Sequence, residues 1–371
     1  MKKLFVLVSL VLFLSGSAFF VFAGGKEKAV EEIVALSPGP VPVEKLAEIA
    51  AKEGDLIVTY GLPDNWAGWS ELFKVFGERY GKPKHFDTDL SSGEEIAKMK
   101  AEQGNPQADL GDIGITWGPK AITEGVIAQY RHKYWDEIPD AYKDPDGHWC
   151  AWYQGYFMFM VNDKAVPKVP RTWKELLDPM YKGKVTIGDP RTAAMYWAAF
   201  WAANFAMGGN ETNMDPGIQY FKKLREMGNM KLIEPSKPAF GKGEIPIYFG
   251  WDFLFLNWAK EFREEANMQI TTLIPEDAAV SLPYVYMINK VAPRPATARL
   301  FVEFVLSDEG QIINAKYFAS PIRPSVKLPP EVAALYPPKE AYRSVKVVDW
   351  IKTEKMKDEF ISRWSHEVLG E

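Results

Sequence analysis

Cysteine and histidine are scarce in this chain of 371 residues, which has one cysteine, Cys150, and four histidines. A single cysteine cannot form an intramolecular disulfide. One cysteine among scattered histidines also cannot supply the usual Cys/His ligands of structural zinc. The sequence therefore excludes a disulfide scaffold and a structural zinc site, and we expect neither a metal nor a cofactor in the functional site.

Long blocks of like charge are absent as well. The 49 acidic and 44 basic residues give a formal net charge of -5. Proteins that bind nucleic acid carry clustered lysine and arginine, so we expect no nucleic-acid partner.

Motifs of common catalytic machineries are also missing. The sequence has no G-x-S-x-G, no H-E-x-x-H, no phosphate-binding G-x-x-x-x-G-K-[ST] and no G-x-G-x-x-G after a strand. Carboxylates are plentiful and could pair for hydrolysis, which leaves an exported hydrolase of glycans or phosphoesters as an alternative. A binding protein that is not an enzyme needs fewer assumptions.

The N-terminus has the pattern of an export signal. Lys2 and Lys3 precede an apolar run over 4–14, and Ala23 follows a second apolar patch. We expect a signal peptide over 1–23, cleaved after Ala23, and a periplasmic or cell-surface protein. The alternative is an uncleaved membrane anchor over 4–23. A linker and an N-terminal helix are predicted over 24–49.

Short apolar runs alternate with helical patterns along the rest of the chain. Strands are predicted at 56–60, 109–115, 156–161, 185–187, 245–249, 270–273 and 284–288, with amphipathic helices between most of them. Such alternation indicates βαβ units and a mostly parallel sheet. The length fits two α/β lobes better than one very large sheet.

Four predicted strand ends lead into helix starts, at 60–66, 91–93, 116–118 and 189–192. In open α/β sheets ligands collect at the carboxyl ends of strands, and the N–H groups at helix N-termini favour anions. These four segments are therefore candidate ligand contacts.

Aromatic residues are abundant, with 13 Trp, 16 Tyr and 22 Phe. Trp197, Phe200, Trp201 and Phe205 recur at helical spacing, which is typical of a core. Trp152 stands near the inferred junction between lobes, whereas Trp251 and Asp252 end a strand. Aromatic side chains at a cleft can stack on a ligand or face a cation.

Several segments together resemble the extracytoplasmic solute-binding proteins of ABC transporters, which are extracellular solute-binding proteins of the family 1 type. The likeness is to the branch that handles ferric iron, thiamine, phosphonates and phosphorylated compounds. The segments that carry it are 50–60, 107–110, 162–164, 170–177, 181–185, 189–191, 296–304 and 306–311.

The resemblance implies a type II periplasmic binding protein fold, in which two lobes joined by a hinge close over a ligand. Each lobe would be a mixed, mostly parallel sheet flanked by helices. Lobe one would comprise 50–150 plus 280–371, and lobe two 151–279. The chain would be a monomer that delivers its solute to separate permease subunits in the membrane.

One departure from the family bears on the ligand. Iron-binding members use adjacent tyrosines, whereas here Tyr196 is followed by Trp197. Ferric iron prefers phenolate and carboxylate oxygens, so an organic anion such as a phosphonate, a phosphorylated compound or a carboxylate is preferred. Ferric iron remains the alternative.

The expected ligand contacts fall into three groups. Arg191 and Thr192 would hold the anion, with Ser91 and Ser92 opposing them. Trp66, Trp117, Trp152 and Trp251 would contact the organic part of the ligand. Asp252 would pair with an amine if the ligand carries one. The full set is Tyr60, Asn65, Trp66, Ser91, Ser92, Trp117, Trp152, Arg191, Thr192, Trp251, Asp252 and Tyr284.

Overall fold

The computed structural model describes residues 37–231, 233 and 235–371. The predicted signal peptide over 1–23, its cleavage after Ala23 and the first part of the predicted linker lie outside this range. Within the range, no helix combines the length and the apolar character that a membrane span requires.

The first group of elements surrounds three parallel strands in the order β2-β1-β3. The sequence predicted β1 and β3 but not β2. In β2, exposed and half-buried residues alternate along a polar segment at the sheet edge, so its pattern lacks an apolar run. The elements are α2 (Val43–Lys52), β1 (Leu56–Tyr60), α3 (Trp69–Tyr80), β2 (Lys84–Thr88), α4 (Ser92–Ala101), β3 (Leu110–Gly114), α5 (Gly118–Thr123), α10 (Pro295–Val305) and α11 (Asp308–Lys316).

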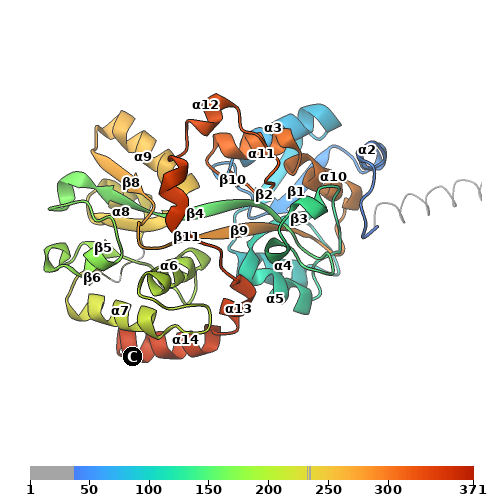
Figure 1. Cartoon of the computed structure of the whole chain (residues 1–371). Helices are drawn as coiled ribbons and strands as arrows, with labels where there is room; N and C mark the ends of the chain where they lie inside the picture. Colours follow the sequence, from blue (N-terminus) through green and yellow to red (C-terminus); the bar gives the residue numbers. More distant parts are fainter. Residues whose placement is uncertain (1–36, 232, 234) are drawn as a thin grey trace, which may run out of the picture.

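Two long strands run between this group and the rest of the molecule (Figure 1). They are β4 (Ala151–Asn162) and β9 (Ala279–Ile288). The first half of β4 pairs with β9, and its second half pairs with β7 (Ile247–Trp251) and β8 (Ile270–Leu273). Because β9 also pairs with β3, one mixed sheet continues through both halves of the molecule.

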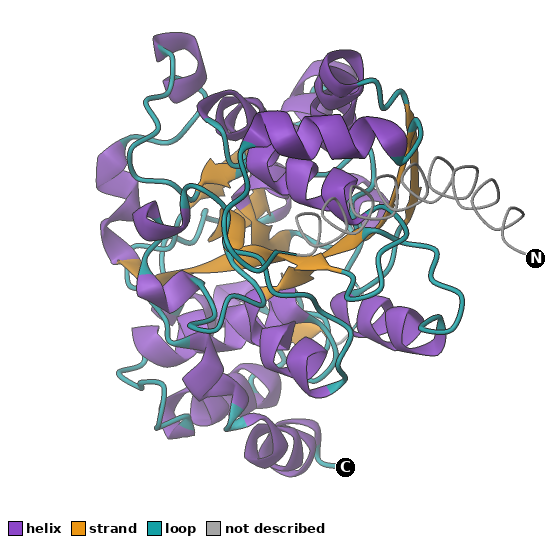
Figure 2. Cartoon of the chain, turned by 90° about the vertical axis from the view of Figure 1, so that its right-hand side faces the viewer, coloured by secondary structure: helices purple, strands orange, loops and turns teal. Residues whose placement is uncertain are grey.

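The second group of elements is built around β5, β6 and β7, with β5 parallel to both neighbours. Helices lie on both sides of the strands (Figure 2). The fold is thus the predicted two-lobe α/β arrangement with a mixed sheet. The elements not yet placed are β5 (Val185–Thr186), α6 (Ala194–Ala206), α7 (Asp215–Glu226), β6 (Met230–Lys231), α8 (Lys237–Gly241) and α9 (Asp252–Ala266).

The C-terminal segment passes from one half to the other. It pairs β10 (Ser320–Pro321) with β4, crosses through α12 (Pro330–Ala333) to β11 (Val345–Lys346) beside β9, and continues through α13 (Trp350–Glu354). It ends in α14 (Lys357–Arg363) and a π-helical turn. These last elements pack against α6 and α7 of the second half, although they were predicted to belong to lobe one. The lobe boundaries themselves stay a prediction.

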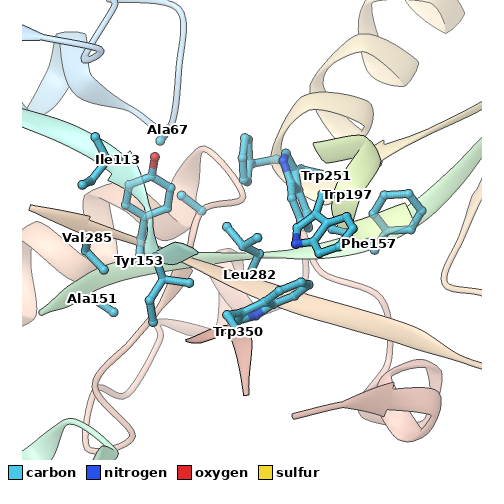
Figure 3. Packing of buried hydrophobic residues seen from close by; sticks show 14 of the residues in the cluster. Ala67, Ile113, Ala151, Tyr153, Phe157, Trp197, Trp251, Leu282, Val285 and Trp350 are labelled. Atoms are coloured by element: carbon cyan, nitrogen blue, oxygen red, sulfur yellow. The ribbon is translucent and has the colours of Figure 1, made fainter. Parts of the chain in front are cut away.

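Aromatic side chains fill the core on both sides of the crossing strands (Figure 3). Trp197, Phe200 and Trp201 of α6 are fully buried, which confirms their prediction as core residues. The rings of Trp197 and Phe200 each lie 4.6 Å, between centroids, from the ring of Phe360 in α14. This aromatic cluster fastens the C-terminus to the helix that begins near the predicted anion contacts.

Phe360→Ala tests how strongly this cluster fixes the C-terminus. Removing a fully buried ring should lower the free energy of unfolding by about 3 to 5 kcal/mol, because it leaves a cavity between α6 and α14. Ile361→Ala, at an exposed neighbouring position, should change it by about 0.5 kcal/mol or less. Urea denaturation of both variants makes the comparison, and equal effects would contradict the packing described.

Candidate ligand-binding site

A cavity of about 270 Å³ lies where the two halves of the molecule meet. Its walls come from the loops that follow β1, β2 and β3, from the start of α6 and from β9. The lining residues are Gly61, Pro63, Trp66, Asp89, Leu90, Ser91, Ser92, Gly93, Glu95, Asp112, Trp117, Thr192, Ala193, Ala194, Met195 and Tyr284. A Cβ placed on Gly114, at the end of β3, would lie 3.8 Å from the Cβ of Ala194, so the two halves approach closely here.

Six of the twelve residues predicted from the sequence are brought together in this lining. They are Trp66, Ser91, Ser92, Trp117, Thr192 and Tyr284. They come from five separate segments, which the carboxyl ends of the parallel strands, the start of α6 and strand β9 bring together. Their contact with a solute remains a proposal.

Three further predicted residues lie away from the cavity lining. Tyr60 is buried, and its hydroxyl donates a hydrogen bond to Glu102 at 2.6 Å. Asn65 is exposed on the loop after β1. Trp152 is fully buried, and its indole N–H donates to Asp112 Oδ1 at 2.8 Å, so it supports a residue of the lining from behind.

Trp251 and Asp252, at the junction of β7 and α9, are completely buried. One carboxylate oxygen of Asp252 accepts the backbone N–H groups of Tyr156 and Phe253, at 3.0 and 2.9 Å. Burial raises the pKa of this carboxyl to about 8. The two residues thus link β4 to α9, and neither is part of the cavity lining.

Arg191 is engaged by the protein itself. Its guanidinium donates to both carboxylate oxygens of Asp189, to Ser365 Oγ at 2.7 Å and to the Glu371 side chain at 2.8 Å. The Asp189 carboxylate is the largest cause of a raised pKa of Arg191. Arg191 therefore ties the C-terminus to the turn that leads into α6.

Two helix N-termini border the cavity. Ser91 precedes α4 and closes a capping box with Glu94, whose Oε2 accepts the Ser91 backbone N–H at 2.9 Å. Ser92 Oγ accepts the backbone N–H of Gly114 at 3.1 Å, which fixes the start of α4 against the end of β3. Helix α6 is preceded by Ala193, whose side chain cannot cap it. The N–H groups of a first helical turn have no partner within the helix, so the start of α6 offers donors to a ligand.

Gly93 leaves room for the ring of Trp117, which together with Trp66 and Tyr284 forms an aromatic wall of the cavity. A Cβ on Gly93 would lie 2.9 Å from the Trp117 ring, so a larger residue would push the indole away. Trp66 lies against the rings of Tyr284 and Phe253, with centroids 5.8 and 4.9 Å apart.

Sequence reasoning missed the three carboxylates of the lining, Asp89, Glu95 and Asp112. An available signal was Asp112 itself, a charged residue in the middle of an otherwise apolar buried strand. Glu95 gave a weaker signal, because a glutamate in the first turn of a helix is ordinary. Among the described residues no lysine or arginine lines the cavity.

A hydrogen-bonded relay supports Asp112 and reaches the aromatic wall. The indole N–H of Trp66 donates to the Tyr153 hydroxyl at 2.8 Å, and this hydroxyl donates to Asp112 Oδ2 at 2.5 Å. The Tyr153 ring stacks on Tyr284, with centroids 5.3 Å apart. Burial raises the pKa of Asp112 to about 8, against the opposing effect of its hydrogen bonds with Tyr153 and Trp152.

Glu95 lies beside Asp112 and is also buried. Its Oε2 accepts the backbone N–H of Asp112 at 3.1 Å, whereas its Oε1 has no hydrogen-bond partner in the part of the chain that the structure describes. Burial is the larger cause that raises the pKa of Glu95 well above its ordinary value, and the nearby Asp112 raises it further. In the same described range, no three His, Cys, Asp or Glu side chains form a group able to hold a metal ion.

Two α/β lobes that share crossing strands and enclose a cavity at their junction define a two-lobe binding protein. The chain belongs to the family of bacterial extracellular solute-binding proteins, whose model matches residues 105–355. It is a solute-binding protein of an ABC transporter, works with permease subunits in the membrane and is not an enzyme, which removes the hydrolase alternative.

Relatives and solved structures agree with this assignment. A protein of Haemophilus influenzae strain Rd, whose name assigns no function, is 33% identical over 64% of this chain and 69% of its own. A Salmonella typhimurium protein, provisionally named as a 2-aminoethylphosphonate-binding periplasmic protein, is 24% identical over 80% of this chain and 85% of its own. The periplasmic binding protein AfuA of Actinobacillus pleuropneumoniae, solved with exogenous fructose-6-phosphate, shares the fold with a TM-score of 0.67. It has 23% identity over 85% of this chain and 99% of its own.

Arg191→Ala separates the two roles considered for this residue. Because its guanidinium is bound to Asp189 and Glu371, its loss should lower the free energy of unfolding by about 1 kcal/mol and change solute affinity less than twofold. Chemical denaturation and calorimetric titration measure the two effects. A loss of affinity of tenfold or more would instead return Arg191 to the binding site.

Proposed function

We propose that the solute is a small organic compound with an anionic group, such as a phosphonate, a phosphorylated compound or a carboxylate. It is captured in the cavity between the lobes and delivered to the permease. The observation that carries this proposal is the convergence of the starts of α4 and α6 on one cavity, together with Ser91, Ser92 and Thr192. Helix N-termini favour anions through free N–H groups and the helix dipole.

The aromatic lining supports an organic body on the same solute. Trp66, Trp117 and Tyr284 are partly buried, and each contributes to the cavity wall. Their faces give apolar contact area, while the hydroxyls and backbone groups fix orientation, as is typical of small-molecule sites. An inorganic anion has no apolar surface and would not pack against these aromatic side chains.

Ferric iron has less support than an organic solute. Tyr196, which stands where adjacent tyrosines would be expected, is buried and absent from the cavity lining. A Cβ on Gly188 would overlap the Tyr196 ring, at 2.0 Å, so the ring lies directly against that glycine. The phenolate pair that ferric iron prefers is therefore not presented to the cavity.

Capture is proposed to involve closure of the lobes about β4 and β9. These strands cross between the lobes at Gly155 and Tyr156 of β4, paired with Leu282 and Ser281 of β9. Closure would bring the start of α6 against the loops after β1, β2 and β3 and would remove the solute from water. We further propose that the protein works as a monomer and that it is exported by a signal peptide cleaved after Ala23.

Ala194→Asp tests the proposed anion site at the start of α6. Ala194 lines the cavity at the first position of the helix. An aspartate there should leave the fold stable, because carboxylates are favourable at helix N-termini, and should repel an anionic solute. Ala194→Asn is the control of equal size without the charge. Calorimetric titration should show at least tenfold weaker binding for the aspartate variant than for the asparagine variant.

The solute for this titration comes from a thermal-shift screen against phosphonates, phosphosugars, thiamine, carboxylates and ferric citrate. A ligand at a hundred times its Kd adds about 2.7 kcal/mol of stability. Equal binding by the aspartate and asparagine variants, or stabilisation by ferric citrate alone, would contradict the proposal.

A further inference from the structure

We infer that the same cavity binds a protonated amino group of the solute at Glu95 and Asp112, so that the solute is a small zwitterion. Its anionic end would lie at the helix N-termini and its ammonium end at the two buried carboxylates. This inference rests on the proposed function and adds the second half of the solute.

The charges of the lining are the first argument. Three carboxylates, Asp89, Glu95 and Asp112, face the cavity, and the described lining contains no lysine or arginine to balance them. A solute with only negative charge would be drawn to the helix N-termini but repelled by the ionised forms of these groups. A solute that carries both charges satisfies both parts of the cavity.

The unpartnered oxygen of Glu95 is the second argument. The side chain is 1% exposed, lines the cavity and leaves Oε1 without a hydrogen-bond partner among the described residues. A buried acceptor without a partner is unfavourable, and this cost is removed if a ligand supplies the donor. An ammonium group has three N–H donors and the opposite charge.

The backbone around Glu95 makes room for its carboxylate. A Cβ on Gly61, which follows β1, would lie 2.4 Å from Oε1, and a Cβ on Gly111 in β3 would lie 2.4 Å from Oε2. Both positions must therefore lack a side chain for the carboxylate to occupy this place. Gly61 also has φ +74°, a conformation that glycine adopts most easily.

The surroundings of the two acids also suit a cation. Trp66, Trp117 and Tyr284 belong to the same lining, and aromatic faces attract ammonium groups. Asp112 accepts hydrogen bonds from Trp152 and Tyr153, which are neutral donors. When Asp112 is ionised, its negative charge is therefore not neutralised by an ion pair within the described chain.

Binding of an ammonium group would favour the ionised forms of both acids. Other titratable groups that act on the pair are Asp87 and Asp89 in and after β2, Tyr153 in β4 and Tyr284 in β9. Burial and the two aspartates oppose ionisation of the pair, whereas the hydrogen bond from Tyr153 favours the ionised form of Asp112. The affinity for a zwitterion should accordingly rise between pH 6 and 8, with release of protons on binding.

Matched solutes test the inference without changing the protein. 2-Aminoethylphosphonate and ethylphosphonate, and likewise 4-aminobutyrate and butyrate, differ in the presence of the amine. Calorimetric titration of the full mature chain should show at least tenfold tighter binding for the amino member of the pair that binds. Equal or tighter binding of the member without the amine overturns the inference but leaves the proposed anion site standing.

Glu95→Gln supplies the second readout. It keeps the size of the side chain and removes its charge, so it should weaken binding of the amino solute at least tenfold and leave the amine-free solute within twofold. Asp112→Asn should act in the same direction if Glu95→Gln does not fold. An unchanged ratio of the two affinities in a folded variant overturns the inference. If no anionic solute binds even the unaltered protein, the proposed function fails as well.

Discussion

The antiparallel pairing of β4 with β9 is the interaction on which the rest of the structure depends. The first half of β4 lies beside β9, which in turn lies beside β3, while the second half of β4 pairs with β7 and β8. Backbone hydrogen bonds therefore run without interruption from one lobe into the other. The same strands deliver side chains to the cavity: Tyr284 comes from β9, and Tyr153, which stacks on it, comes from β4.

Support for the site comes from groups buried behind it. Tyr153 holds both the Trp66 indole and Asp112, and Trp152 holds the other oxygen of Asp112. Carboxyls buried in this way cost stability, because burial disfavours their charged forms. In the proposed site this cost would serve recognition, since a stable core alone would be better served by apolar residues.

Much of the fold could be predicted from the sequence, because strands such as β1 and helices such as α3 carry clear apolar periodicity. The edge strand β2 lacks that pattern, and β4 and β9 begin earlier than their apolar runs. The lateral pairing that extends them is not visible along the chain. The direction of Trp152 is equally hidden, because the register of β4 shifts between Ala151 and Tyr153.

The candidate site divides in the same way. Residues at strand ends, such as Ser92 and Trp117, were predicted because strand-to-helix turns have local signatures. The environment of Arg191 was not, because only its partner Asp189 is close in sequence, whereas Ser365 and Glu371 lie 174 and 180 residues further along the chain. Glu95 was not predicted as a site residue, because its local sequence already explains it. A glutamate in the first turn of a helix is ordinary, so the local sequence gives no reason to expect a further role. The burial of Glu95 becomes visible only in the structure, where Gly61 and Gly111 pack around its carboxylate.

In the proposed site, the starts of α4 and α6 hold the anionic group of a solute between the lobes. A crystal structure of the protein with its solute, found by the thermal-shift screen, tests this claim most directly. We expect the anionic oxygens to lie about 2.7 to 3.2 Å from backbone nitrogens or hydroxyl oxygens at those two helix starts. A solute bound outside this cavity, or an anion held by Arg191, would contradict it.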